Sequence, residues 1–282
     1  MWFGIALPDP VPTSSGRGGS TFPAGVARES PVGVFGFPSA GPVLPDWWEV
    51  WDFQPLRQDS SMAAHPPIRS FKGRTGRMGT KQLDSWAAAE QTIMLPNARW
   101  NLPRPVTLDI GSGMGEATLS LARAEPHRTV VAIDVFRRGL ANTMHSVSTE
   151  QLTNVRVFSG DCLRALEQYV PARSVSQIVV WFPDPWPKRN QRKRRLIRPW
   201  FLKLAAQALS GNGELRIATD SADYAMEIDA VISADPGLTG GQTKRPQWRP
   251  VTKFERKGIA ANREIVDFCY HAVRDANRPG VE

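Results

Sequence analysis

Cysteine is scarce in this sequence, with Cys162 and Cys269 the only two among 282 residues. Two cysteines cannot form the disulfide framework of a small secreted domain, nor a zinc site built mainly from cysteine. The scarcity favours a reducing compartment, and we expect no bound metal.

Long apolar runs are also lacking. No segment approaches the roughly 18 consecutive apolar residues of a membrane-spanning helix. The opening residues 1–7, MWFGIAL, have no basic region before them and are followed by Pro8 and Asp9, so they make a poor signal peptide. We therefore expect a soluble, cytoplasmic protein with no membrane partner.

Acidic residues are the minority, with 27 Asp and Glu against 35 Lys and Arg, a net charge of +8. The excess of positive charge is unevenly distributed along the chain. Residues 1–61 hold three arginines, no lysine and six acids, a net charge of −3. Residues 62–282 hold 32 basic and 21 acidic residues, a net charge of +11. A domain this basic indicates a polyanionic partner, although the charge alone does not name it.

The first 61 residues differ in kind from the rest. They contain nine prolines and eight glycines and show no helical or strand periodicity, so we expect a disordered tail before a domain at 62–282. The aromatic cluster at 47–53 could instead dock on that domain. Met62 directly precedes the change in composition and is an alternative start of translation.

From about residue 105, apolar strands and amphipathic helices alternate. Six strands are predicted, at 105–110, 128–134, 154–158, 176–182, 213–218 and 263–273. Helices are expected between the strands, ending at Ala124, spanning 136–148 and 162–169, and running from Pro199 to Gly211. Repeated strand–helix units predict an α/β fold, a doubly wound and mainly parallel sheet with a ligand crevice at the carboxyl ends of its strands.

A glycine-rich loop, with Gly111, Gly113 and Gly115, follows the first strand. Glycines let the backbone turn tightly and approach a ligand, and the next helix offers free N–H groups. The dinucleotide fingerprint G-x-G-x-x-G would place glycine at position 116, where this chain has glutamate. The loop predicts a cofactor site but does not identify the cofactor.

Acidic residues at the ends of three successive strands indicate which cofactor the loop binds. Asp109 would repel a pyrophosphate by roughly 3 kcal/mol at ~5 Å and an effective dielectric of ~20, and it would favour a cation such as the sulfonium and ammonium of S-adenosylmethionine. Asp134 is placed to accept from a ribose diol and Asp161 from an adenine amino group. Arg137 and Arg138 leave NADP as an alternative, which the intact Asp134 opposes.

The fourth strand ends in a rigid turn, FPDPWPK (182–188). Its prolines hold Asp184 and Trp186 at the mouth of the crevice. A carboxylate beside an aromatic plane suits a nucleobase, which can hydrogen-bond along one edge and stack on its face. The turn therefore predicts a nucleobase substrate.

A basic run follows at 188–195, where six of eight residues are Lys or Arg. Beside a cofactor crevice, such a run predicts a cradle for a phosphate backbone, which positions a nucleic acid without reading its sequence. The predicted backbone contacts are Arg189, Arg192, Lys193, Arg194 and Arg195.

From about Arg69 to its end, the chain resembles the bacterial tRNA (guanine-N7-)-methyltransferase family. Four motifs carry the resemblance, namely RSFKGRTGRM (69–78), LDIGSGMGE (108–116), FPDPWPK (182–188) and TKFERKG (252–258). The last two are highly specific as a pair. The family usually has Glu where this chain has Asp109 and Asp134, and Arg-His-His where it has Asn190-Gln191-Arg192.

The resemblance implies a class I Rossmann-like methyltransferase fold, S-adenosyl-L-methionine as donor, and guanine 46 in the tRNA variable loop as acceptor. It implies tRNA as partner, and we expect a monomer or a small homo-oligomer. It assigns Asp109, Asp134, Asp161 and Asp184 to cofactor binding, and Asp184 also to the active site. The matching substrate-binding positions are Lys188, Asp220, Thr252, Lys253, Phe254 and Glu255.

Two other functions remain open at this point. The Asp-Pro-Trp sequence at 184–186 is similar to the (Asp/Asn)-Pro-Pro-aromatic turn used to methylate amino groups of nucleobases or proteins, although the second proline is absent. A non-catalytic RNA-binding module on the same fold would not need the retained acids and glycines.

Guanine N7 carries a lone pair and no proton, so its methylation requires no general base.

Overall fold

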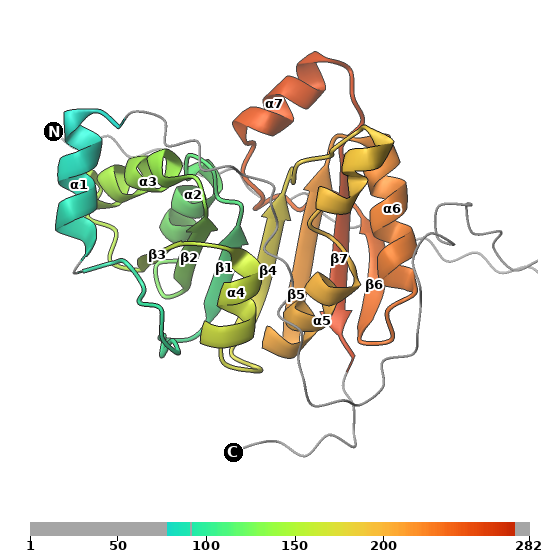
Figure 1. Ribbon diagram of the computed structural model, residues 1–282, viewed down its shortest axis with the longest axis horizontal. Helices are drawn as coiled ribbons and strands as arrows, with labels where there is room; N and C mark the ends of the chain where they lie inside the picture. The colour runs from blue at the N-terminus through green and yellow to red at the C-terminus, as the bar shows by residue number, and fades with distance from the viewer. Residues whose placement is uncertain (1–77, 91, 274–282) are drawn as a thin grey trace, which may run out of the picture. The chain divides into compact units, whose positions relative to one another are not determined.

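The computed structural model describes residues 78–90 and 92–273 (Figure 1). The predictions for the tail at 1–61, for a start at Met62 and for nearly all of the motif at 69–78 lie outside these residues. Among the helices of the described ranges, none is long and apolar enough to cross a membrane.

A seven-stranded sheet in the order β3-β2-β1-β4-β5-β7-β6 forms the centre of the described part of the chain. Neighbouring strands from β3 to β5 are parallel, whereas β7 is antiparallel to both β5 and β6. The strands are β1 (Val106–Ile110), β2 (Thr129–Asp134), β3 (Val155–Ser159), β4 (Val175–Trp181), β5 (Leu209–Thr219), β6 (Leu238–Thr243) and β7 (Val266–Ala272). This is the doubly wound, mainly parallel arrangement that the sequence predicts.

Helices cover both faces of the sheet, and α7 lies beyond the carboxyl ends of the central strands (Figure 1). The α-helices are α1 (Thr80–Glu90), α2 (Glu116–Ala124), α3 (Arg137–Thr149), α4 (Cys162–Arg164), α5 (Pro199–Ala208), α6 (Ala222–Ser233) and α7 (Lys253–Ala260). A π-helical turn at Ala165–Tyr169 continues α4, and a 3₁₀ helix spans Arg189–Arg194.

Two hydrophobic cores lie on the two faces of the sheet. Strand β2 contributes to both, because alternate side chains of a strand point to opposite faces. Val131 and Ile133 pack in the core that α5 and α6 cover, and Val130 and Ala132 pack in the core that α2 and α3 cover. Burial on both faces explains why the predicted strands are apolar almost throughout.

The six predicted strands are confirmed, and so are the helices between the first four. One boundary is wrong, because the helix from Pro199 ends at Ala208 and not at Gly211. Strand β5 begins at the next residue, where Leu209 pairs with Val175 of β4, so Gly211 lies inside a strand. Pairing with β4 overrides the local glycine signal in this segment.

Candidate active site

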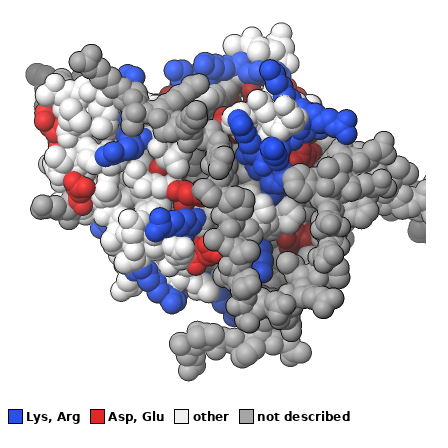
Figure 2. Space-filling view, viewed as in Figure 1, with Lys and Arg blue, Asp and Glu red and all other residues white. Residues whose placement is uncertain are grey.

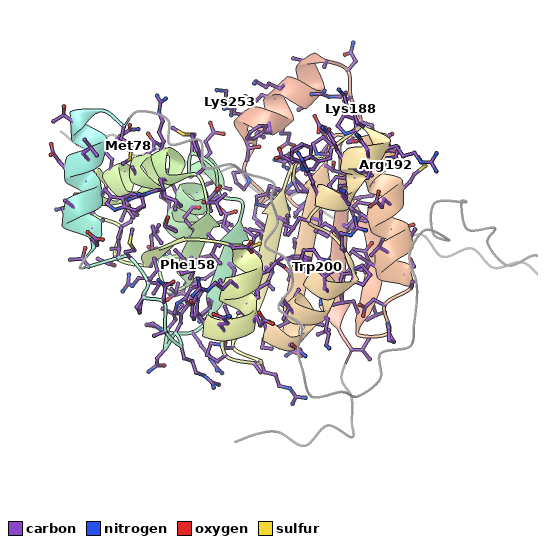
Figure 3. All side chains as sticks on the ribbon, viewed as in Figure 1. Met78, Phe158, Lys188, Arg192, Trp200 and Lys253 are labelled. Carbon is purple, nitrogen blue, oxygen red and sulfur yellow. The ribbon has the colours of Figure 1, made fainter. Side chains whose placement is uncertain are left out.

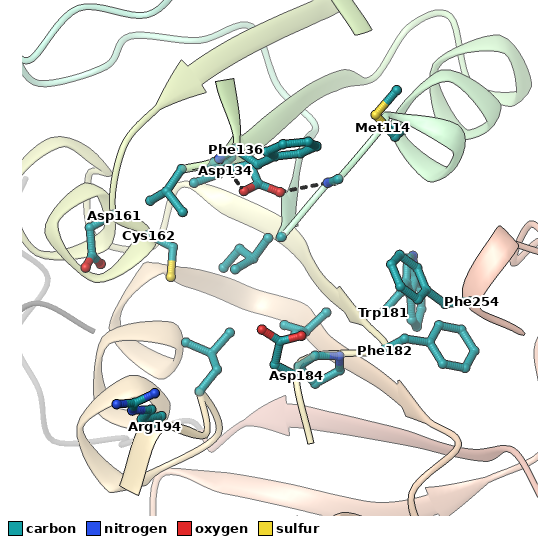
Figure 4. A pocket seen from close by; sticks show the side chains of 18 of the residues that line it. Met114, Asp134, Phe136, Asp161, Cys162, Trp181, Phe182, Asp184, Arg194 and Phe254 are labelled. Atoms are coloured by element: carbon teal, nitrogen blue, oxygen red, sulfur yellow. Dashed lines mark hydrogen bonds between the residues drawn. The ribbon is translucent and has the colours of Figure 1, made fainter. Parts of the chain in front are cut away.

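A cavity of about 390 Å³ lies at the carboxyl ends of the parallel strands (Figure 4). The segments that follow β1, β2, β3 and β4 line it, and Phe254 of α7 reaches it from outside the sheet. Its volume falls within the roughly 300–1,000 Å³ of small-molecule sites. Four segments far apart in the sequence therefore converge where the parallel topology predicts a ligand.

Gly111 and Gly113 form part of the cavity lining, with φ angles of 75° and 56°. A Cβ atom at Gly111 would meet no atom within 4 Å, so the backbone is open to a ligand there. Gly115 has a different surrounding, because a Cβ atom at that position would lie 2.2 Å from Oγ1 of Thr143 in α3. The first two glycines thus face the cavity, and the third lets the loop pack against α3.

The carboxylate of Asp134 ties the glycine loop to the start of α3. Its Oδ2 accepts a hydrogen bond from the Gly113 N–H and its Oδ1 accepts one from the Phe136 N–H, each at 2.8 Å (Figure 4). Burial raises the pKa of Asp134, the two backbone donors oppose that rise, and the charge of Asp184 adds to it. Asp134 and Asp184 face each other across the cavity, which makes the space between them favourable for a cation.

Asp109 lies behind the loop and is not among the residues that line the cavity. It is only 2% exposed, and its Oδ2 accepts a hydrogen bond from the Thr118 hydroxyl of α2. Burial raises the pKa of this carboxyl to about 7. The structure thus ties Asp109 to α2, the helix that follows the glycine loop.

Asp161 caps α4 at the cavity wall. Its Oδ1 accepts a hydrogen bond from the Leu163 N–H at 2.8 Å, a cap that stabilises the first turn of a helix. Cys162, the next residue, also lines the cavity, and burial raises the pKa of its thiol. A thiol held in its protonated form is a weak nucleophile, so Cys162 is not suited to covalent catalysis.

The turn after β4 places Asp184 at the cavity mouth, where its side chain is exposed. The backbone is strained on both sides of it, since Phe182 and Trp186 have φ angles of 53° and 37° and neither is glycine. Arg195 holds the turn from inside, because its Nε donates a hydrogen bond to the Pro185 carbonyl at 2.7 Å. The guanidinium of Arg194 lies over the Trp186 ring, 4.8 Å from its centroid.

The basic run separates into exposed and internal side chains. The prediction that Arg195 contacts an RNA backbone is wrong, because this residue is 1% exposed and forms ion pairs with Asp223 and Glu227 of α6. A buried guanidinium needs such partners, and α6 supplies two. Arg192 is half-buried and also pairs with Asp223, at 2.7 Å.

Lys188, Arg189 and Lys193 are exposed. In Figure 2, Lys and Arg side chains gather along the edge of the molecule where Figure 3 places Lys188, Arg192 and Lys253. This edge borders the cavity mouth and is the part of the basic run that remains open to a partner.

Helix α7 carries the last motif, and its side chains point in different directions. Thr252 is buried and caps the helix, while Phe254 is 56% exposed and lines the cavity mouth. Glu255 is 2% exposed, and its two oxygens bind Arg245 and Arg249 at 2.7–2.9 Å. The structure thus turns Glu255 inward, where two arginines bind its carboxylate.

Three further contacts hold α7 and its surroundings. Glu116, at the start of α2, accepts hydrogen bonds from the Lys253 N–H and from the Arg256 guanidinium. Asp220, after β5, forms an ion pair with Arg263 at 2.8 Å. Glu116 thereby fastens α7 to the start of α2, and the ion pair joins the segment after α7 to the end of β5.

The chain matches one family model and several relatives that share one name. The family model described as "Putative methyltransferase" matches residues 103–268. A Nocardioides sp. protein named tRNA (guanine-N(7)-)-methyltransferase is 39% identical over 214 residues, which are 72% of this chain and 86% of that protein. Proteins of the same name from Nitrosospira multiformis and Streptomyces avermitilis are 34% and 36% identical; each match covers 75% of this chain, and they cover 97% and 78% of the relatives. This chain belongs to the tRNA (guanine-N7-)-methyltransferase family.

The motifs of the tRNA (guanine-N7-)-methyltransferase family occupy distinct parts of this site. LDIGSGMGE (108–116) forms the floor of the cavity, and FPDPWPK (182–188) forms the wall opposite it. TKFERKG (252–258) forms most of α7, of which Phe254 reaches the cavity. The resemblance drawn from the sequence is therefore confirmed at the level of family and of fold.

A buried ion cluster beneath α7 is not predicted from the sequence. Arg249 is 1% exposed, pairs with Glu255 and Asp267, and lies over the rings of Trp181 and Phe182 at 5.5 and 5.7 Å. It connects α7 with β7 and with the end of β4. No spacing rule reveals it, because its partners come from a helix and from a strand on either side of a turn.

The raised pKa of Asp109 predicts a pH dependence of stability. The unfolded carboxyl has a pKa of 3.8 and the folded one about 7, so between these values the folded state binds the extra proton. The contribution of Asp109 therefore becomes less favourable as pH rises from about 4 to about 7. Asp109→Asn keeps an acceptor for Thr118 and cannot ionise.

Thermal unfolding at pH 5, 6, 7 and 8 tests this prediction. We expect the midpoint of the wild type to fall, relative to that of Asp109→Asn, as pH rises to 8. Parallel pH profiles for the two proteins would contradict the buried, proton-binding state of Asp109.

Proposed function

We propose that this chain transfers the methyl group of S-adenosyl-L-methionine to N7 of a guanine in tRNA, guanine 46 of the variable loop. The observation that carries the proposal is the position of Asp184, which stands on a rigid turn between the glycine loop and the exposed cations. The relatives named tRNA (guanine-N(7)-)-methyltransferase, at 33–39% identity, support this reaction. We expect the enzyme to act in the cytoplasm.

The residues around the cavity fit the proposed donor. Gly111 and Gly113 let the methionyl part approach the backbone, and the carboxylates of Asp134 and Asp161 can accept from a ribose diol and an adenine amino group. The facing carboxylates of Asp134 and Asp184 favour the cationic sulfonium over a neutral ligand. Asp109 acts indirectly in this scheme, by supporting α2 and the loop.

When bound, the donor supplies a methyl group on a sulfonium; the new bond joins that carbon to N7, and the electrons of the broken C–S bond remain on sulfur. The protein contributes orientation and electrostatics. Asp184 accepts from the guanine N–H groups and opposes the positive charge that grows on the ring. No residue has to take a proton from N7, because N7 carries none.

The substrate contacts divide between direct and supporting ones. Lys188, Arg189 and Lys193 hold phosphates at the cavity mouth, together with Lys253 across from them. Phe254 offers an apolar face to the base. Glu255 works through Arg249 and Arg245, which fix α7, and Thr252 works as the cap of that helix.

Nucleoside analysis tests the reaction. We expect full-length protein incubated with labelled S-adenosylmethionine and an unmodified tRNA transcript to yield 7-methylguanosine, and a transcript with adenine at position 46 to stay unlabelled. Asp184→Asn should lower the rate by about 10²-fold, the scale of losing one electrostatic contact.

Three outcomes of that assay would overturn the proposal. Label in N6-methyladenosine would favour an amino-group methyltransferase. Binding of tRNA without any label would favour an RNA-binding module. An Asp184→Asn variant as fast as the wild type would remove Asp184 from the active site.

A salt titration tests the exposed cations. We expect replacement of Lys188, Arg189 and Lys193 by Gln to lower the slope of log affinity against log salt by about two to three, since each lost phosphate contact removes ~0.7–0.9. The matched control replaces three exposed arginines near the amino ends of β1 and β4, Arg99, Arg104 and Arg173, by Gln. An equal effect in both triple variants would show that net charge, and not this edge, binds tRNA.

A further inference from the structure

Three potential metal-ligating side chains lie together on the sheet face opposite α5 and α6. Glu214 of β5 pairs directly with His271 of β7, and Arg216 pairs with Cys269. Residues that face each other across an antiparallel pair share one face of the sheet. Glu214, Cys269 and His271 therefore project to the same side, although β5 and β7 lie far apart in the sequence.

The distances between their polar atoms match those around a tetrahedral ion. Cys269 Sγ lies 3.5 Å from His271 Nε2 and 3.7 Å from Glu214 Oε2, and all three ligand atoms lie within 4.8 Å of one another. Zinc binds sulfur at ~2.3 Å and nitrogen or oxygen at ~2.0–2.1 Å, so its tetrahedral ligands stand about 3.3–3.6 Å apart. Two of the three separations are already close to these values.

Neighbouring side chains orient the carboxylate. Glu214 Oε1 accepts from the Gln177 amide at 2.7 Å, and Oε2 accepts from Arg216 at 2.8 Å. Gln177 in turn accepts from the Thr107 hydroxyl at 3.1 Å. A carboxylate has about four acceptor sites, so these bonds leave room for a metal, and partners of this kind commonly fix a ligand in place.

The cluster is accessible and separate from the cavity. His271 is exposed, and a Cβ atom at Gly241, the β6 residue opposite Cys269, would meet nothing within 4 Å. Glu214 lies five residues before Thr219, the end of β5, or roughly 16 Å from the edge of the sheet that holds the cavity. A fourth ligand can thus come from solvent, and none of these three residues lines the cavity.

We propose that Glu214, Cys269 and His271 bind one zinc ion, with water as the fourth ligand, and that this ion fastens β7 to β5. The Cys269 thiol releases its proton to solvent as the Zn–S bond forms, and the imidazole binds in its neutral form. Zinc is the metal that best suits one sulfur, one nitrogen and one oxygen ligand in a tetrahedron. The ion then cross-links two strands that are distant in the sequence.

Cobalt spectroscopy of the full-length, untagged protein tests the site. After removal of metal by a chelator, we expect one equivalent of Co²⁺ to produce the visible bands of tetrahedral cobalt and a thiolate-to-cobalt charge-transfer band, and Zn²⁺ to abolish both. Cys269→Ser should lose the charge-transfer band, and the matched variant Cys162→Ser should keep it. His271→Ala should weaken zinc binding at least tenfold, whereas His127→Ala should not.

Thermal unfolding gives a second readout. Zinc should raise the melting midpoint of the wild type and of His127→Ala, but not that of Cys269→Ser or His271→Ala. The proposal is overturned if wild-type protein shows no thiolate-to-cobalt band, if Cys269→Ser keeps that band, or if zinc stabilises all four proteins equally.

Discussion

The cavity depends on one carboxylate, that of Asp134, which accepts hydrogen bonds from the Gly113 and Phe136 backbones. These two bonds join the loop after β1 to the turn after β2, so neither segment can move without the other. Helix α3 closes on the loop from behind, because a Cβ atom at Gly139 would lie 1.9 Å from the Gly113 carbonyl oxygen. Glycine at position 139 is therefore required for packing, whereas glycine at position 113 is favoured by its φ angle of 56°.

On the side of the cavity opposite the glycine loop, buried arginines hold the segments of the site together. Arg195 binds the turn that carries Asp184, and Arg249 binds Glu255 and Asp267 beneath α7. Each guanidinium is paired with two carboxylates, which offsets the cost of removing its charge from water. In a chain this basic, some of the charge therefore builds the site, and only the exposed remainder is open to an anionic partner.

Most strands of the fold can be predicted from the sequence because they are buried on both faces. A short apolar run such as 176–182 is typical of such strands. Part of the cavity lining can also be predicted, because parallel strands bring their carboxyl ends together. The residues concerned are Gly111, Gly113, Asp134 and Asp184. The burial of Arg195 and Glu255 could not be predicted. A charged side chain is expected to be exposed unless its buried partners are known, and the sequence does not identify those partners. Strand β6 has two glycines and no apolar alternation, and it is held by pairing with β7 and by the burial of Leu238 in the core.

Calorimetric titration of S-adenosylhomocysteine into wild type and Asp134→Asn tests the role of Asp134 most directly. Asparagine offers one acceptor oxygen, so one of the Gly113 and Phe136 amides would face an NH₂ group, a loss of roughly 1–3 kcal/mol. We predict a dissociation constant at least tenfold higher in the variant, with an unchanged circular dichroism spectrum. Equal affinity in the two proteins would contradict it.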